Sequence, residues 1–233
     1  MNETQKSALI VGAGAGVSAS LARLCGADGM RVALAARNID KLADIASETG
    51  AALHQCDASQ IDQVESLFAA TDAAMGTPDL VVYNPSARVR GPIADLDPQA
   101  AQDAINITCF GAFLVAQQAA RRMVRRGSGS ILFTGASAGV KGFANSSVFA
   151  MGKFGLRGLA QSLARELHPQ NIHVGHFVID GGIANPNRED RIDDGTDNML
   201  SADAIAQSYM QFHKQHRSAW AWEIELRPWV EKF

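Results

Sequence analysis

Three glycines near the start of the chain form the first pattern that points to chemistry. Gly12, Gly14 and Gly16 lie in a Gly-Ala-Gly-Ala-Gly segment, with an apolar run before it and an amphipathic run after it. Glycine lets a strand-to-helix turn approach a pyrophosphate closely, and the N–H groups at the helix start attract the anion. The segment therefore predicts a phosphate site for a dinucleotide, formed by these glycines together with Ala15 and Val17.

An arginine follows the second apolar run. Arg37 stands just after Ala36, at the point where a dinucleotide-binding fold places a residue against the adenosine ribose. An acidic residue there would accept hydrogen bonds from both ribose hydroxyls of NAD, whereas arginine pairs with the 2′-phosphate of NADP. The sequence predicts a preference for NADP(H), with NAD(H) still possible; a surface arginine beside a helix is the alternative.

Alternating apolar and amphipathic runs must position this turn. The predicted strands are Ala8–Val11, Val32–Ala35, Ala52–Gln55, Leu80–Tyr83, Ser130–Thr134, His173–Ile179 and one near Trp220–Leu226. The predicted helices are Val17–Asp28, Ile39–Glu48, Gln60–Met75, Pro98–Arg126, Met151–Leu167 and Ala202–Lys214. Apolar strands separated by helices indicate a parallel sheet covered on both faces. We expect an α/β fold of Rossmann type, a doubly wound seven-stranded parallel sheet, in one domain spanning residues 1–233.

Composition excludes several classes of partner. With 21 basic and 24 acidic residues the net charge is -3, so neither nucleic acid nor an anionic membrane is expected as a partner. No apolar run approaches the ~20 residues that span a bilayer. Cys25, Cys56 and Cys109 have neither disulfide nor metal-ligand spacing. We expect a cytoplasmic protein without a signal peptide or a metal site.

On these residues the chain resembles the short-chain dehydrogenase/reductase family over nearly all of its length. The glycine turn has that family's spacing, although the usual last glycine is Ser18 here. Asp57 matches the family's adenine-contacting aspartate, and Ala58 follows it. Asn84, followed by Pro85, stands in the family's turn after the fourth strand. The resemblance implies that these last four residues contact the cofactor.

The resemblance also implies a catalytic apparatus, which is altered here. Phe149 and Lys153 occupy the family's Tyr-x-x-x-Lys site, Asn106 matches its helix asparagine, and Ser137 lies one residue after the serine position, which is Ala136. In the family the tyrosine is the general acid, the lysine binds the nicotinamide ribose, the serine orients the carbonyl oxygen and the asparagine holds a water. Phenylalanine has no ionisable proton. Lys153 and Asn106, which the resemblance assigns to cofactor and water, are therefore present, whereas the serine and tyrosine positions that handle the proton are changed.

Another acid would have to replace the tyrosine. The resemblance places Asp180 and Gly181 beside the nicotinamide, with Ile183 just beyond, as cofactor contacts. Burial there would raise the pKa of the Asp180 carboxyl and make it a candidate acid, while a turn-capping aspartate is the alternative. Tyr83, at a strand end, is a second candidate for which a core role is favoured. The family's enoyl-reductase branch has its tyrosine at the position of Ser146, so it does not match.

Two functions are consistent with this site. The first is an NADP(H)-dependent oxidoreductase that moves a hydride between nicotinamide and a small carbonyl- or alcohol-like substrate, with an altered proton donor. The second is a non-catalytic NADP(H)-binding protein, a sensor or assembly partner. The polar, acidic loop Ala184–Asn198 lies after a strand's carboxyl end, which favours a substrate lid over a solvated surface loop.

Glycines in the predicted helix Met151–Leu167 indicate close packing. Gly152, Gly155 and Gly158 each cost about 1 kcal/mol relative to alanine, so another element is expected to approach them. The resembled family uses this helix at a subunit interface, and the tail from Trp220 carries all three tryptophans. We expect a homo-oligomer, a dimer or tetramer, with part of the tail docked on a neighbour; packing within one chain is the alternative.

Overall fold

One continuous parallel sheet organises the molecule. The computed structural model describes residues 5–185 and 188–232 and orders the strands β3-β2-β1-β4-β5-β6-β7. The strands are β1 (Ser7–Val11), β2 (Arg31–Ala36), β3 (Ala52–Gln55), β4 (Leu80–Tyr83), β5 (Gly129–Thr134), β6 (Ile172–Ile179) and β7 (Glu223–Leu226). All neighbouring pairs are parallel. Because the order reverses between β1 and β4, the predicted doubly wound fold is confirmed.

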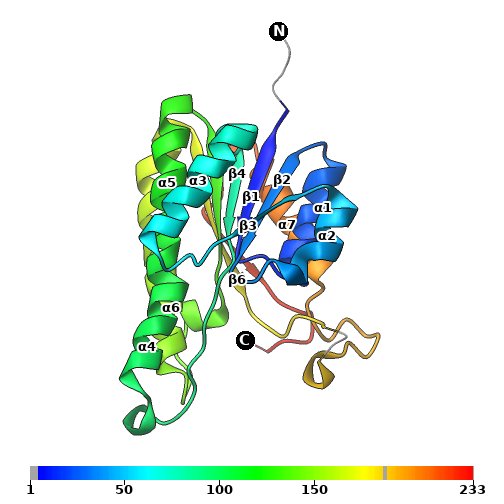
Figure 1. Cartoon of the computed structure of the whole chain (residues 1–233). Coiled ribbons are helices and arrows are strands. Elements are labelled where there is room, and N and C mark those ends of the chain that lie inside the picture. The colour runs from blue at the N-terminus through cyan, green and yellow to red at the C-terminus, as the bar shows by residue number, and fades with distance from the viewer. Residues whose placement is uncertain (1–4, 186–187, 233) are drawn as a thin grey trace.

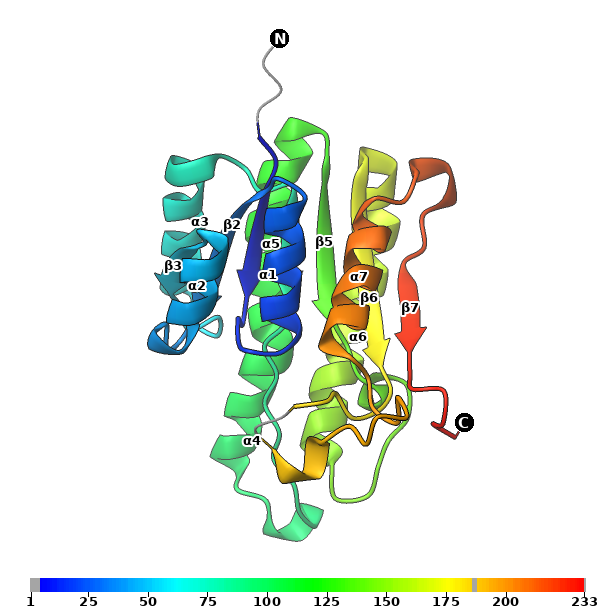
Figure 2. The same ribbon diagram turned by 90° about the vertical axis from the view of Figure 1, so that its right-hand side faces the viewer.

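Helices cover both faces of the sheet (Figure 1, Figure 2). The helices α1 (Val17–Ala27), α2 (Ala43–Thr49) and α7 (Ala202–His213) lie on one face; α3 (Ile61–Met75), α5 (Gly111–Arg126) and α6 (Ser147–Leu167) lie on the other, with α4 (Pro98–Ile105) leading into α5. Alternate residues of β1 enter opposite cores, Leu9 on the α5 side and Ile10 on the α1 side. Burial on both sides explains why the central strands are continuously apolar.

Several predicted boundaries differ in the structure; the predicted helix Ile39–Glu48, for example, consists of a 3-10 helix, Asp40–Leu42, followed by α2 from Ala43. The predicted helix Pro98–Arg126 is divided by a π-helix, Asn106–Phe110, in which the Ile107 carbonyl accepts a hydrogen bond from the buried Tyr83 hydroxyl. A π-helix turn of this kind is frequent at functional sites. α6 begins at Ser147, four residues before its predicted start, and β7 begins at Glu223 rather than near Trp220.

The tryptophans of the tail dock mainly on their own chain. The Trp220 ring stacks on His173, with centroids 4.4 Å apart and planes 3° apart. Trp222 packs against the core on the α5 side. The Trp229 indole N–H donates to the Thr196 carbonyl at 2.9 Å, although the side chain is 77% exposed. Packing within one chain therefore accounts for Trp220 and Trp222.

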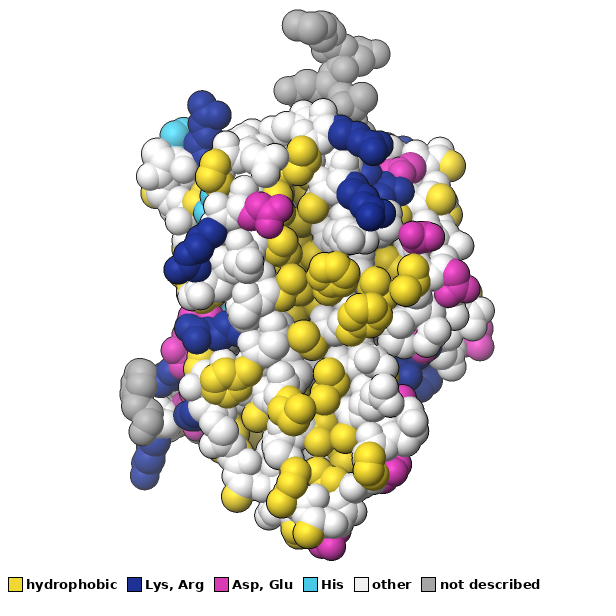
Figure 3. Space-filling model, turned by 90° about the vertical axis from the view of Figure 1, so that its left-hand side faces the viewer, with side chains coloured by type: hydrophobic (Ala, Val, Ile, Leu, Met, Phe, Trp, Pro, Cys, Tyr) yellow, Lys and Arg dark blue, Asp and Glu magenta, His cyan; other side chains and the backbone are white. Residues whose placement is uncertain are grey.

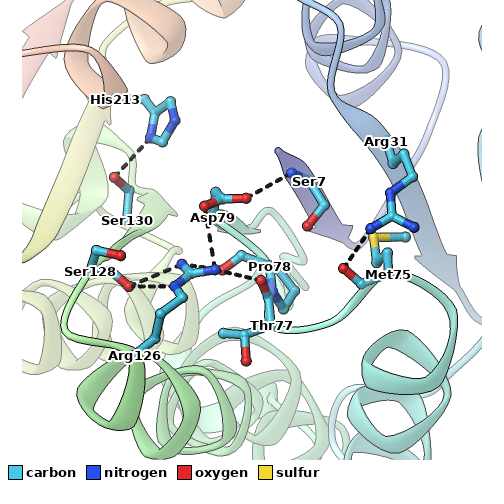
Figure 4. Close-up of polar contacts among 10 residues, drawn as sticks. All are labelled: Ser7, Arg31, Met75, Thr77, Pro78, Asp79, Arg126, Ser128, Ser130 and His213. Atoms are coloured by element: carbon cyan, nitrogen blue, oxygen red, sulfur yellow. Dashed lines mark hydrogen bonds and ion pairs between the residues drawn. The ribbon is translucent and has the colours of Figure 1, made fainter. Parts of the chain in front are cut away.

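Arg126, the last residue of α5, holds the amino ends of the central strands (Figure 4). Its guanidinium donates to the carbonyls of Thr77 (2.6 Å), Pro78 (3.0 Å) and Ser128 (3.0 Å). It also lies 3.3 Å from the Asp79 carboxylate, which accepts the Ser7 N–H at 2.8 Å. One cation thus ties α5 to the starts of β1, β4 and β5.

Arg126→Met should destabilise the fold by about 2 kcal/mol, because several carbonyls and one carboxylate lose a charged donor. Urea unfolding measures the change. Arg125→Met is the matched control, since Arg125 is an exposed neighbour on the same helix and its loss alters net charge equally. Equal stability of the two variants would show that the Arg126 contacts contribute nothing.

Candidate functional site

The glycine turn has room for a phosphate where the sequence placed one. Gly12 has φ +78°, and a Cβ there would lie 2.5 Å from the Pro85 nitrogen, so only glycine fits. A Cβ at Gly14 or Gly16 would meet nothing within 4 Å, which leaves open space above the turn. α1 begins after Gly16, at Val17, with no side-chain cap and no acidic residue in its first turn. Its positive end is therefore available to an anion, as a dinucleotide pyrophosphate requires.

Asn84 joins the turn to the end of β4. Its backbone N–H donates to the Val11 carbonyl, and its amide group donates to the Ser18 hydroxyl at 2.8 Å. The Ser18 hydroxyl in turn lies 3.4 Å from the Gly12 carbonyl. Ser18 thus fastens the turn at the position where the family's last glycine is expected. Ala15, which sits in the turn itself, is exposed.

The adenosine end of the expected cofactor site is polar. Arg37 follows β2 on the surface and forms no ion pair with any residue that the structure describes. Asp57 follows β3, and its carboxylate accepts hydrogen bonds from the backbone and hydroxyl of Ser59. Ala58 is buried, with its carbonyl 2.6 Å from where a Cβ of Gly111 would stand. The side chain of Asp57 is thus held in place, and Arg37 is free to meet a phosphate.

The two positions that handle the proton in the family are apolar here. Phe149 is 7% exposed and clusters with Ala136 and Ala138, which flank Ser137. Ser137 is half-buried, and its hydroxyl has no hydrogen-bond partner among the residues described. Ala136 therefore occupies the contact with Phe149, and the structure does not bring the Ser137 hydroxyl into a hydrogen bond there.

Lys153 is the buried cation of the site. It lies one turn after Phe149 on α6, with its Nζ 5.9 Å from the centre of the Phe149 ring. The ammonium donates to the Thr134 carbonyl at 2.7 Å and is 2% exposed as a residue. Burial, and to a lesser extent the charge of Arg88, lowers the pKa of Lys153 to about 7. This amine can therefore gain and lose a proton near neutral pH.

The π-helix between α4 and α5 presents Asn106. Asn106 is its first residue and is half-buried, on an element that contacts α6. Tyr83 packs beneath it, and burial raises the pKa of Tyr83 far above its usual value. Together with its hydrogen bond to Ile107, this makes Tyr83 a structural residue, which confirms the favoured core role.

Asp180 is buried, as one of its two predicted environments requires, and it also forms ion pairs that neither prediction included. Its carboxylate is buried between two cations, 3.7 Å from Lys141 Nζ and 3.5 Å from an Arg227 nitrogen. These two ion pairs join it to the segment before α6 and to the segment after β7. Gly181, with φ +145°, fits closely against Pro228, and Ile183 forms a β-bridge with Leu200. Asp180 therefore anchors the tail beside the site.

The loop predicted as a lid begins at that bridge. Residues 184–198 include a short 3-10 helix, Glu189–Arg191, and residues 186–187 lie outside the described part of the chain. The Arg191 side chain runs along Gly182, since a Cβ there would lie 2.3 Å from a guanidinium nitrogen. Its role as a substrate lid remains a prediction.

Close packing of α6 is confirmed at two of its three glycines. A Cβ at Gly152 would lie 3.0 Å from Thr108, and one at Gly155 would lie 2.6 Å from the Cys109 sulfur. At Gly158 no described atom of the same chain stands within 4 Å of that position, so an approach there by a second copy remains a prediction. The same side of the molecule carries hydrophobic side chains that face outward (Figure 3), and the large exposed ones on these elements are Phe110, Phe113, Met151 and Phe154.

Residues 6–194 match the short chain dehydrogenase family. The chain therefore belongs to the short-chain dehydrogenase/reductase family, a family of oxidoreductases with nicotinamide cofactors. The 3-oxoacyl-(acyl-carrier-protein) reductase MabA of Mycobacterium tuberculosis is 30% identical over 167 residues, 72% of this chain and 65% of the reductase. The match thus spans slightly less than two thirds of that relative. Trans-4-hydroxycyclohexanecarboxylate dehydrogenase of Sinomonas cyclohexanicum is 32% identical, over 78% of this chain and 74% of the dehydrogenase.

Solved structures agree with this assignment. A short-chain dehydrogenase from Rhodopseudomonas palustris has a TM-score of 0.84 and 33% identity, covering 96% of this chain and 99% of that one. A metagenomic short-chain oxidoreductase in complex with NADP has a TM-score of 0.84 and 25% identity, covering 98% and 99%. Within the described residues, no cluster of His, Cys, Asp and Glu is arranged to hold a metal, and no helix has the length and apolarity to cross a membrane.

Lys153→Met should change how stability depends on pH. The folded-state pKa of Lys153 is about 7 and its ordinary value is 10.5, so between these values the folded chain binds fewer protons than the unfolded one. Its contribution to wild-type stability therefore rises with pH over that window, and the variant lacks this rise. We expect the difference in unfolding free energy between wild type and variant to increase by about 2–4 kcal/mol as pH rises through this window. Urea unfolding at several pH values measures this difference.

Lys41→Met removes an exposed lysine and serves as the control, for which the same difference should stay flat. A flat difference for Lys153→Met as well would mean that Lys153 remains an ordinary, charged lysine in the folded protein.

Proposed function

We propose that this protein is an NADP(H)-dependent oxidoreductase that reduces a small carbonyl substrate, or oxidises the corresponding alcohol, with Lys153 in place of the usual tyrosine as proton source. The observation that carries the proposal is the buried Lys153 amine beside Phe149, with a pKa of about 7. The nicotinamide supplies the hydride. The glycine turn, Asn84, Asp57 and Arg37 would hold the phosphates and adenosine, and Lys153 and Asn106 the nicotinamide ribose and a water.

Lys153 has the donors for both tasks. An ammonium group has three N–H donors, and only one is used, by the Thr134 carbonyl. The remaining two suffice for a ribose hydroxyl and a substrate oxygen. In reduction Lys153 would give one N–H proton to the carbonyl oxygen and keep the electron pair of that bond, and the neutral amine would then regain a proton from solvent. A pKa near the working pH suits a group that acts in both directions.

Asp180 is the less suitable acid. Its carboxylate is engaged by Lys141 and Arg227, whereas the Lys153 amine lies beside Phe149. The observed contacts support Lys153 as the proton source and Asp180 as a positioning residue for the tail.

The pH dependence of reduction tests this assignment. We expect kcat/KM for carbonyl reduction to fall as pH rises through about 7, because the ammonium form is the acid. Lys153→Arg keeps a cation and its hydrogen bonds but cannot release a proton, so turnover should fall by at least ~100-fold while NADPH affinity changes little. Asp180→Asn is the comparison variant, and its kcat/KM should still fall as pH rises through about 7. If Asp180→Asn lost this pH dependence while Lys153→Arg stayed active, the proton donor would be Asp180 and not Lys153.

Cofactor preference depends on Arg37 in this proposal. Arg37→Asp should weaken NADPH binding relative to NADH by about 100-fold, since a charge-assisted phosphate contact is replaced by repulsion. Fluorescence titration with both cofactors measures the ratio. Arg125→Asp makes the same charge change on a remote exposed helix and should leave the ratio unaltered. An unchanged ratio in Arg37→Asp would remove the basis for the NADP preference.

The first experiment is a titration with NADPH and NADH, followed by cofactor oxidation against aldehydes, ketones, quinones and imines. Turnover on any of these acceptors supports the enzyme. Tight NADPH binding without turnover on the panel would favour the non-catalytic binding protein, which the reductase and dehydrogenase relatives do not favour. Absence of binding to either cofactor would overturn the proposal.

We also propose that the protein forms a homo-oligomer in a reducing compartment, the cytoplasm. The exposed side chains Phe110, Phe113, Met151 and Phe154 lie on neighbouring elements, as an apolar contact between copies would require. The cysteines Cys25, Cys56 and Cys109 are all unpaired.

A further inference from the structure

Phe149 is the platform for an arginine. The Arg88 guanidinium carbon lies 4.2 Å from the centre of the Phe149 ring, within the range of a cation–π contact. The planar group stacks through its face and keeps its N–H edge for other partners. The residue that replaces the family's tyrosine therefore does more than remove a hydroxyl, because it places a cation beside the reacting position.

The backbone that carries Arg88 is fixed to the same elements that hold Phe149. The Ala87 N–H donates to the Thr108 hydroxyl at 3.1 Å, and buried Thr108 packs where a Cβ of Gly152 would come within 3.0 Å. Farther along, the Gly91 N–H donates to the Asn145 carbonyl at 3.1 Å, just before α6. The stacking of Arg88 on Phe149 thus rests on a segment tied at two points.

The charge around Arg88 is one-sided. No hydrogen bond or ion pair to Arg88 is present within residues 5–185 and 188–232. Partial burial lowers its pKa, and the charges of Arg90, Arg191 and Arg188 lower it further. Asp190 forms ion pairs with two of these arginines, Arg188 and Arg191. It does not contact Arg88. Within the described residues Arg88 thus has no acidic partner, and its guanidinium is open to an anion from solution.

We propose that Arg88, held on Phe149, binds an anionic group of the substrate, a carboxylate or a phosphate, with Arg90 and Arg191 strengthening the positive field. A guanidinium edge matches the two oxygens of either group, which explains why an arginine is suited to the position. The inference rests on the proposed function, because it names the substrate class for that same site. Arg88 lies beside Phe149 and Lys153, whereas Arg37 after β2 is the residue assigned to the cofactor phosphate.

The test uses protein saturated with NADPH and two probes, oxamate and inorganic phosphate, each titrated calorimetrically at constant ionic strength. Oxamide is the neutral comparison for oxamate. We expect one or both anions to bind in preference to oxamide, and Arg88→Met to weaken that binding by about 10-fold or more. Phe149→Leu, which keeps an apolar side chain but removes the ring, should also weaken it. Arg125→Met lowers the net charge equally and should have no effect.

The outcomes separate the class of ligand from the proposed function. Binding of oxamate alone identifies a carboxylate, and binding of phosphate alone identifies a phosphate ester. The inference is overturned if neither anion binds, or if wild type and Arg88→Met bind the anions equally. NADPH binding in the same experiment would leave the proposed oxidoreductase function standing. Should NADPH itself not bind, the oxidoreductase fails, and the comparison of wild type with Arg88→Met on the unloaded protein still decides the anion site.

Discussion

The contact between Gly12 and Pro85 is the constraint on which the rest of the site depends. It joins the carboxyl ends of β1 and β4, where the strand order reverses and a crevice opens. On one side it sets the turn that leads into α1, whose uncapped start is open to an anion. On the other, the chain continues from Pro85 through Ala87 to Arg88. The close contact between the Gly12 backbone and the Pro85 ring therefore positions both the cofactor turn and the segment that carries Arg88.

The altered residues form a consistent set. Ala136 and Phe149 contact each other where a serine and a tyrosine hydroxyl would otherwise meet, so the exchange leaves no unsatisfied hydroxyl between them. Lys153 consequently sits beside an apolar ring with one carbonyl partner, and desolvation, together with the charge of Arg88, lowers its pKa. Arg88 then covers the ring from outside. Loss of the tyrosine thus accompanies a change in the protonation of the lysine and in the charge around it.

The sequence predicted most of the sheet because buried parallel strands are continuous apolar runs, and their ends are marked by residues such as Gly12 and Asn84. It failed where a boundary depends on distant contacts. Periodicity alone extends one helix through the π-helix, in which the Ile107 carbonyl accepts a hydrogen bond from Tyr83 on a distant strand. Arg88 escaped notice for the same reason, since its stacking partner Phe149 belongs to another element. The cations on Asp180 come from separate loops, so its surroundings were equally hidden from local patterns.

The salt bridge between Asp180 and Arg227 has a consequence for biosynthesis. The residues that cradle a phosphate all lie before β5, whereas Arg227 follows the last strand. A growing chain can therefore assemble its nucleotide-binding half while the carboxylate beside the crevice still awaits its partner. The carboxylate gains its second cation only after β7 has been synthesised, and without Arg227 it would keep only Lys141 of these two cations.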